Sequence, residues 1–153
     1  MDLDGTDIRL LSALQDDATL RLDALAERAG ISTATAQRRV RRLRETGVIR
    51  GTVALLDGAR LGHPLTVIIM VELEREQTHH LDAFAARARA DAQVQQCYYV
   101  TGEADFCLIC LVPDMPALQH LAERMFHADP NVRRFRTSTV LSTRKLGLTV
   151  PLP

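Results

Sequence analysis

Five arginines within seven consecutive residues are the side chains of this sequence best suited to binding chemistry. They are Arg38, Arg39, Arg41, Arg42 and Arg44, and the next acid is Glu45. Guanidinium groups this close together repel one another, and an anionic ligand offsets the repulsion. Residues 38–50 carry a net charge of +5, although the 153-residue chain has a formal charge of zero. This local charge indicates a nucleic-acid-binding surface, and the alternative is a solvated helix face.

The arginines lie on one predicted helix. Ser32 can cap its N-terminus by accepting a hydrogen bond from a free backbone N–H group. Gly47 can supply the left-handed residue that ends it. Between them, Ala36, Val40 and Leu43 recur at helical spacing and predict one apolar face. The arginines therefore project from the remaining surface.

Two further helices are predicted before the basic one. Asp4–Gln15 and Leu22–Ala29 have helical apolar periodicity, and Gly30 ends the second segment. Two helices joined by a tight turn that contains glycine are typical of a helix-turn-helix unit, whose second helix is the recognition helix. Val48–Leu56 is predicted to be a short strand and a candidate wing. We place this DNA-binding domain at residues 1–56.

The predicted contacts with double-stranded DNA follow from position along the recognition helix. The N-terminal residues of such a helix meet base edges. Those that we expect at or near the bases are Ser32, Thr33, Thr35, Gln37 and Arg38. Arg38 is the first choice for guanine, since paired hydrogen bonds from arginine to guanine are the commonest specific contact. Arg39, Arg41 and Arg42 are expected to contact phosphates, which position the protein without specifying sequence.

The second half of the chain alternates strands and helices after a Gly- and Pro-containing linker at residues 57–64. The predicted strands are Thr66–Glu74, Val94–Thr101, Ala104–Val112 and Val132–Ser142. The predicted helices are Thr78–Ala90 and a segment that Asp114 caps and that ends at His127. The order βαββαβ is that of a ferredoxin-like domain, here at residues 65–153, and the whole chain is of the α+β class.

Both faces of the predicted sheet are apolar. In the first strand, Val67, Ile69 and Val71 point one way, and Ile68 and Met70 point the other way. The two helices can cover only one face, and an open apolar face is an aggregation hazard. We therefore expect a homodimer built through this domain. A dimer also presents two recognition helices to half-sites roughly 34 Å apart.

Several other classes of site find no support in the sequence. The three cysteines and five histidines lack metal-ligand spacing, and the odd cysteine count argues against a disulfide framework. No nucleophile or acid–base set is recognisable, so we predict no catalytic residue, metal or cofactor. No signal peptide or membrane-length apolar run is present, so we expect a cytoplasmic protein without membrane contact.

Three segments together make the sequence similar to the Lrp/AsnC (feast/famine) family of transcriptional regulators. They are LDGTDIRLLSALQDDATLRLDALAERAGISTATAQRRVRRLRETGVIRG, the linker-like LDGARLG, and VTGEADFCLICLV with its Gly-x-x-Asp turn. The resemblance covers nearly the whole chain and implies an amino-acid-responsive DNA-binding regulator. It also implies dimers that assemble further, up to octamers. In the family pattern an arginine commonly stands at the position of Arg39, which could instead bridge the two halves of the domain.

The turn from Gly102 to Asp105 is the candidate effector site. A free amino acid needs an acceptor for its ammonium group, which Asp105 offers. It also needs donors for its carboxylate, which backbone N–H groups of Thr101, Gly102 and Glu103 can supply because glycine allows close approach. The alternative is that Asp105 only caps the turn.

The resemblance extends this site to a neighbouring dimer. In the family, the loop and the last strand of such a neighbour form the pocket, which implies that Tyr99, Thr137 and Thr139 take part. Ala104 departs from the family, where an aromatic residue is common. Two other functions remain open: a tetrapyrrole (sirohaem) decarboxylase-like enzyme with the same domain plan, and a DNA-architectural protein without effector control.

Overall fold

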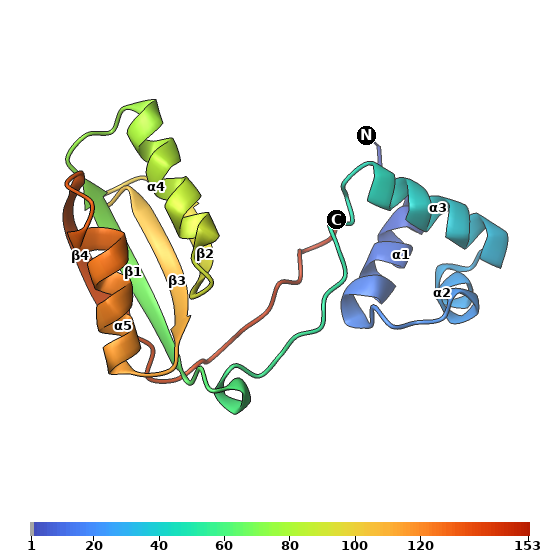
Figure 1. The fold of residues 1–153 in the computed structure, drawn as a ribbon. Coiled ribbons are helices and arrows are strands. Elements are labelled where there is room, and N and C mark those ends of the chain that lie inside the picture. Colours follow the sequence, from blue (N-terminus) through green and yellow to red (C-terminus); the bar gives the residue numbers. More distant parts are fainter. Residues whose placement is uncertain (1) are drawn as a thin grey trace. The chain divides into compact units, whose positions relative to one another are not determined.

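The computed structural model describes residues 2–153, and the chain divides into two compact units (Figure 1). The helical unit contains the described residues up to Leu55 together with Lys145–Pro153, and the sheet unit spans Leu56–Arg144. In the helical unit, the side-chain amide of Gln15 exchanges two hydrogen bonds with the backbone of Val150, at 2.7 and 3.2 Å. The domain boundaries at residues 1–56, 57–64 and 65–153 stay a prediction.

Three helices form the body of the helical unit: α1 (Gly5–Asp16), α2 (Leu22–Ala29) and α3 (Thr33–Glu45). Asp4 and Asp7 form a capping box at the start of α1, in which each carboxylate accepts a backbone N–H of the other residue. Gly30 ends α2 in the left-handed region. The predicted helix-turn-helix order is confirmed, and its core includes Leu10, Ala29 and Ala36, which are fully buried.

The predicted strand at Val48–Leu56 is wrong. These residues form no strand, and the side chains of Val53, Leu55 and Leu56 are exposed. A strand requires hydrogen bonds from a neighbouring strand, and the helical unit provides no such neighbour to this segment. The apolar sequence of Val53–Leu56 is compatible with an extended backbone but does not by itself make a strand.

The sheet unit has the predicted βαββαβ order. A short 3₁₀ turn, η1 (Ala59–Leu61), precedes it. The strands are β1 (Leu65–Leu73), β2 (Val94–Tyr99), β3 (Phe106–Val112) and β4 (Val132–Thr139). They form one antiparallel sheet in the order β2-β3-β1-β4. The ferredoxin-like prediction is confirmed.

The helices α4 (Thr78–Ala90) and α5 (Met115–Ala122) lie on the same face of this sheet (Figure 1). Asp114 caps α5, as predicted, by accepting the N–H of Ala117 at 2.8 Å. The helix continues as a π-helical turn, η2 (Glu123–His127), so the predicted end at His127 is confirmed but the change of helix type is new. Val67, Ile69 and Val71 face the helices and are fully buried.

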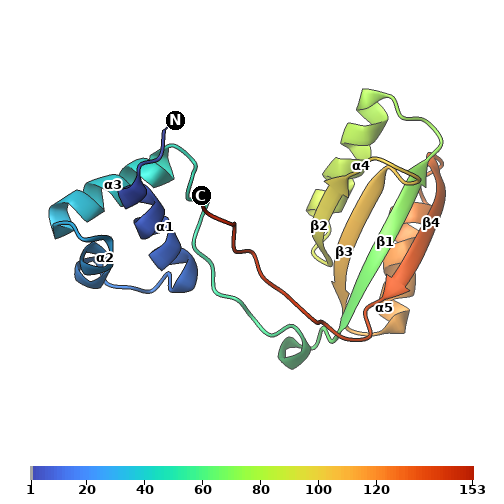
Figure 2. The same cartoon turned by 180° about the vertical axis from the view of Figure 1, so that it is seen from behind.

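The other face of the sheet, turned toward the reader in Figure 2, carries no helix. Ile68 pairs with Ile109 there, and Met70 pairs with Cys107, so the two central strands present apolar side chains on this side as well. All four side chains are half-buried within the single chain. Among residues 2–153, no helix has both the length and the apolar character needed to cross a bilayer.

Candidate DNA-binding surface and effector loop

The N-terminal turn of α3 is the part of the helix predicted to meet DNA bases. The Ser32 hydroxyl caps the helix by accepting the N–H of Thr35 at 3.3 Å, and it lies 2.9 Å from the Thr35 hydroxyl. Ser32, Thr33, Gln37 and Arg38 are exposed, and Thr35 is half-buried. The surface is therefore accessible to a ligand, although the Ser32 hydroxyl already has partners.

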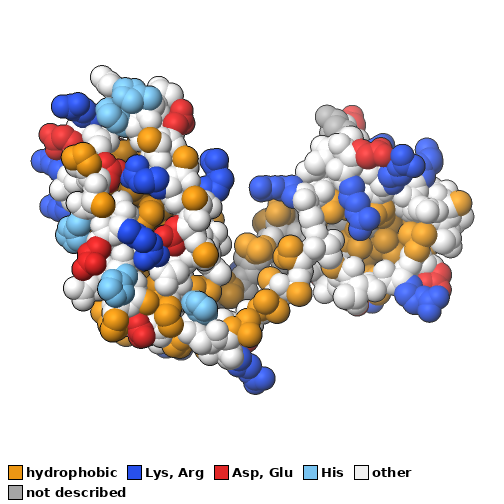
Figure 3. Space-filling view, in the orientation of Figure 1, with side chains coloured by type: hydrophobic (Ala, Val, Ile, Leu, Met, Phe, Trp, Pro, Cys, Tyr) orange, Lys and Arg blue, Asp and Glu red, His pale blue; other side chains and the backbone are white. Residues whose placement is uncertain are grey.

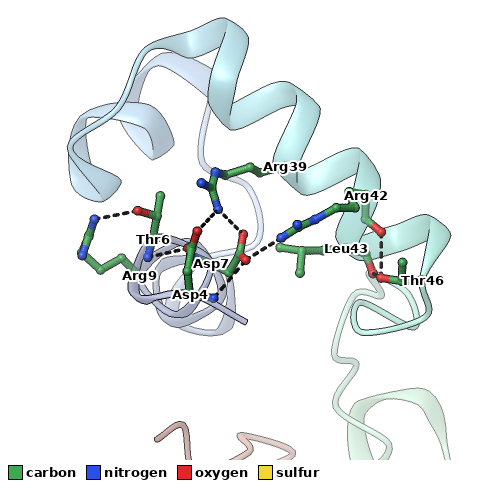
Figure 4. A network of polar contacts seen from close by, with 8 residues as sticks. All are labelled: Asp4, Thr6, Asp7, Arg9, Arg39, Arg42, Leu43 and Thr46. Carbon is green, nitrogen blue, oxygen red and sulfur yellow. Dashed lines mark hydrogen bonds and ion pairs between the residues drawn. The ribbon is translucent and has the colours of Figure 1, made fainter. Parts of the chain in front are cut away.

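Two arginines of α3 form ion pairs with the start of α1 (Figure 4). Arg39 Nη1 lies 2.7 Å from Asp4 Oδ2 and 2.9 Å from Asp7 Oδ1. Arg42 Nη2 lies 2.5 Å from Asp7 Oδ2. The Asp7 side chain is 1% exposed, whereas the side chains of Arg39 and Arg42 are 22% and 45% exposed, so the two arginines cover a buried carboxylate. This network joins the recognition helix to the first helix.

The charges of the network stabilise one another. Burial raises the pKa of Asp7, but hydrogen bonds from Arg39 and Arg42 outweigh burial and hold that pKa below its ordinary value. A hydrogen bond from the backbone N–H of Asp7, together with Arg39, lowers the pKa of Asp4. The hydrogen bonds to Asp4 and Asp7 raise the pKa of Arg39. Both acids are therefore ionised at neutral pH.

The remaining arginines of α3 differ in how far they are neutralised. Arg41 Nε lies 2.7 Å from Glu45 Oε1, and both side chains are well exposed. Arg38 and Arg44 form no ion pair within residues 2–153 and are exposed. In Figure 3, Lys and Arg side chains lie around an apolar area of the helical unit. The uncompensated positive charge of α3 therefore lies at Arg38 and Arg44.

Asp4 and Asp7 are the residues of this site that sequence reasoning did not find as partners of the arginines. The Asp-x-x-Asp spacing before an apolar run identifies a capping box. It does not identify Arg39, which lies 32 residues beyond Asp7 in the chain. The bridging alternative for Arg39 is the arrangement that the structure contains.

The predicted effector loop connects β2 to β3 and contacts β1. Gly102 has a φ of 117°, which favours glycine. Asp105 Oδ2 accepts the N–H of Leu73 at 2.7 Å, and the Asp105 N–H donates to the carbonyl of Val71 at 2.9 Å. Thr101, Gly102 and Glu103 are exposed. One oxygen of Asp105 therefore connects the loop to β1, and the two roles predicted for this residue, effector contact and turn cap, stay predictions.

The other predicted effector residues lie apart from one another in a single chain. Tyr99 is on β2 and packs its ring 5.5 Å from that of Phe106. Thr137 and Thr139 are exposed on β4, opposite Ile69 and Val67 of β1. Since β2 and β4 are opposite edges of the sheet, one chain does not bring Tyr99 next to the two threonines.

One charged contact connects the loop to β4. Arg136 Nη1 lies 3.2 Å from Glu103 Oε2, and Arg136 Nη2 lies 3.4 Å from Glu72 Oε1. Arg134 also pairs with Glu72, at 2.8 Å, and lowers the pKa of that carboxyl. Arg134 and Arg136 lie opposite Glu72 and Met70, so this cluster belongs to the face without helices.

Two family models match the chain. Residues 3–50 match a winged helix-turn-helix DNA-binding domain, and residues 66–150 match the Lrp/AsnC ligand binding domain. The leucine-responsive regulatory protein of Rhizobium meliloti is 40% identical over 137 residues, which are 90% of this chain and 88% of that protein. The Bkd operon transcriptional regulator of Pseudomonas aeruginosa is 34% identical over 151 residues, 99% of each chain.

Solved structures resemble the whole chain. An AsnC family transcriptional regulator from Agrobacterium tumefaciens is 30% identical, with a TM-score of 0.90 and 97% of each chain covered. A transcriptional regulator from Neisseria meningitidis, solved as a complex with L-Met, is 31% identical with a TM-score of 0.91, covering 98% of this chain and 97% of that one. The helix-turn-helix and ligand-binding units therefore occur together in these relatives.

Proposed function

Since this chain belongs to the Lrp/AsnC family of transcriptional regulators, we propose that it recognises specific DNA sites as a homodimer or larger assembly and that an amino acid alters this binding. The observation that carries the DNA proposal is the recognition helix α3, whose exposed Arg38 forms no ion pair within residues 2–153. Relatives that are named transcriptional regulators, at identities up to 40% over most of the chain, support it.

We assign different DNA contacts to the residues of α3. We propose that the N-terminal part of α3 faces base edges. The residues are Ser32, Thr33, Thr35, Gln37 and Arg38. Arg41 is proposed to contact a phosphate, because it can replace its exposed ion pair with Glu45 by an ion pair with the phosphate. For Arg39 and Arg42, the pairs with Asp4 and Asp7 favour the bridging role over phosphate contact.

The experiment that tests base recognition is the substitution Arg38→Ala. A guanidinium that makes paired hydrogen bonds with guanine gives about 1–3 kcal/mol of discrimination at one base pair. We expect the variant to lose that preference when binding sites are selected from a random duplex pool and scored by sequencing. Arg44→Ala is the matched control, because it removes an equally unpaired arginine at the other end of α3. Unchanged affinity and unchanged base preference in Arg38→Ala would exclude Arg38 from the contact.

For the effector, we propose an α-amino acid at the Gly102 loop. The support is chemical: Asp105 uses Oδ2 for the N–H of Leu73, and its Oδ1 has no hydrogen bond within residues 2–153, so it can accept from an ammonium group. The regulator from Neisseria meningitidis solved with L-Met supports an amino-acid class of ligand. The neighbouring copy is proposed to supply Thr137 and Thr139.

Titration of the full chain with the common amino acids, followed by calorimetry and by binding to a selected duplex, tests this proposal. We expect one amino acid or a few related ones to bind and to change DNA affinity. Asp105→Asn should weaken that binding while the hydrogen bond to Leu73 N–H is kept by the amide oxygen. DNA binding that no amino acid changes would favour the architectural function.

A further inference from the structure

Two acids form ion pairs with arginines of the recognition helix that could otherwise contact DNA phosphates. We propose that Asp4 and Asp7 are specificity-determining residues of this regulator. By pairing with Arg39 and Arg42, they hold two guanidinium groups away from DNA phosphates and fix the rotation of α3 against α1. The inference rests on the proposed DNA-binding function and adds residues that do not themselves touch DNA.

The geometry of the network can hold α3 in a fixed rotation against α1. The two oxygens of Asp7 bind Arg39 and Arg42 separately, and these arginines are three residues apart, which is about one turn of α3 (Figure 4). Two contacts one turn apart resist rotation of the helix about its axis. Asp4 adds a second bond to the same Nη1 atom of Arg39. The presentation of Arg38 next to Arg39 depends on this rotation.

The position of Arg39 also shows that its guanidinium is directed inward. Its side chain is only 22% exposed, and its Nε atom is buried with no hydrogen-bond partner among the described residues. A buried, incompletely satisfied guanidinium is costly unless acids compensate its charge. Asp4 and Asp7 provide that compensation, so Arg39 has counter-ions inside the protein before any DNA arrives.

The charge balance has a consequence for binding. Sequence-independent affinity depends on how many phosphates are neutralised by Lys and Arg, and each such contact steepens the salt dependence. The network has a net charge of zero, because two acids balance two arginines. Arg39 and Arg42 therefore add little to the binding of random DNA. Arg38 is presented to base edges only while the network holds the rotation of α3, so releasing Arg39 and Arg42 raises non-specific affinity more than specific affinity. The intact network therefore gives a higher ratio of specific to non-specific affinity than five free arginines would.

The test is Asp4→Asn in the full chain. Asparagine is an equally good helix cap, so α1 keeps its start while Arg39 loses one counter-ion. We expect affinity for a scrambled duplex to rise about twofold to fivefold, and the slope of log K against log [salt] to steepen by up to about 0.9. Affinity for a duplex selected from a random pool should change less, so the specificity ratio falls. Fluorescence anisotropy with both duplexes over a series of KCl concentrations measures all three quantities.

Three further variants isolate the cause. Asp2→Asn makes the same charge change near the same end of α1, where Asp2 has no ion pair within the described residues, and should leave the slope unchanged. Adding Arg39→Gln to Asp4→Asn should return the slope to the wild-type value. Asp7→Asn should give a larger effect than Asp4→Asn, with its folding checked by circular dichroism.

The outcomes separate this inference from the proposed function. An unchanged slope and specificity ratio in Asp4→Asn, or an equal shift in Asp2→Asn, would overturn the role of the acids while DNA binding stands. A general loss of affinity for both duplexes in a folded Asp4→Asn variant would mean that the acids are only structural. A wild-type protein that binds no duplex would overturn the proposed function and this inference together.

Discussion

Asp7 is the residue of the helical unit whose ionisation matters most for stability. Its carboxylate is buried and its pKa is held below the ordinary value of 3.8. A group with a depressed folded-state pKa contributes stability above its unfolded pKa, and the contribution is lost as the pH falls through the folded-state value. The contribution of Asp7 is therefore complete at neutral pH and declines as the pH falls below about 4.

We predict that Asp7→Asn lowers the free energy of unfolding at pH 7 by about 3 kcal/mol, because it leaves Arg39 and Arg42 without a buried counter-ion. The penalty should shrink on acidification from pH 4 downward, since the wild-type protein then loses the same ion pairs. Urea unfolding followed by circular dichroism between pH 7 and pH 3 measures both effects. Asp23→Asn, at an exposed pair with Arg21, is the control. A penalty independent of pH would contradict the assignment.

At the residue scale, local signals were predictable and long-range partners were not. Ser32, Gly30 and Gly47 act within a few residues of their own position, so sequence spacing identified their roles. The pairing of Asp7 with Arg39 depends on how α1 packs against α3. Apolar periodicity does not predict such a contact between distant residues. The sequence therefore did not show which of the five arginines are paired with acids.

At the scale of elements, the helices and strands followed from apolar periodicity because each has a buried face. The five α-helices and four strands of the described chain, residues 2–153, were all predicted, with ends displaced by a few residues. The two misses have different physical causes. The strand at Val48–Leu56 lacks a hydrogen-bonding partner, and the π-helical turn at Glu123–His127 keeps the same apolar side chains buried, Met125 and Phe126, with a different backbone pattern.

The effector loop provides a prediction at the same scale. Gly102 has a φ of 117°, and a Cβ at this position would meet no atom within 4 Å, so Gly102→Ala acts through the backbone alone. We expect strain of about 1–3 kcal/mol and weaker amino-acid binding, because the loop must shift to relieve that strain. Thermal unfolding and calorimetry with the bound amino acid measure the two effects. Gly147→Ala, with a φ outside the positive region and equally open space, should change neither. Full amino-acid affinity in Gly102→Ala would argue against this loop as the site.

At the scale of the whole molecule, the apolar face of the sheet is the feature that a single chain leaves without a partner. Its centre consists of Ile68, Met70, Cys107 and Ile109 on the two middle strands, with Leu111 beside Thr66. Arg134 and Arg136 border it along β4, where both pair with Glu72 and Arg136 also pairs with Glu103. An apolar centre with a polar rim is the composition of a protein interface. We therefore expect a second copy of the chain to cover this face.

Ile109→Glu tests that expectation, because it places a charge at the centre of the proposed interface while the buried face of β3 is unchanged. We expect the variant to shift from dimer to monomer in sedimentation velocity experiments at micromolar concentration. Loss of the second recognition helix should also weaken binding to a two-half-site duplex by on the order of 100-fold, because the second half-site contact is no longer intramolecular. Ala83→Glu adds the same charge on the exposed surface of α4 and should keep both properties. If Ile109→Glu remained dimeric with full operator affinity, the chain would have to dimerise through another surface, and the two-sided apolar pattern of β1 and β3 would need a different partner.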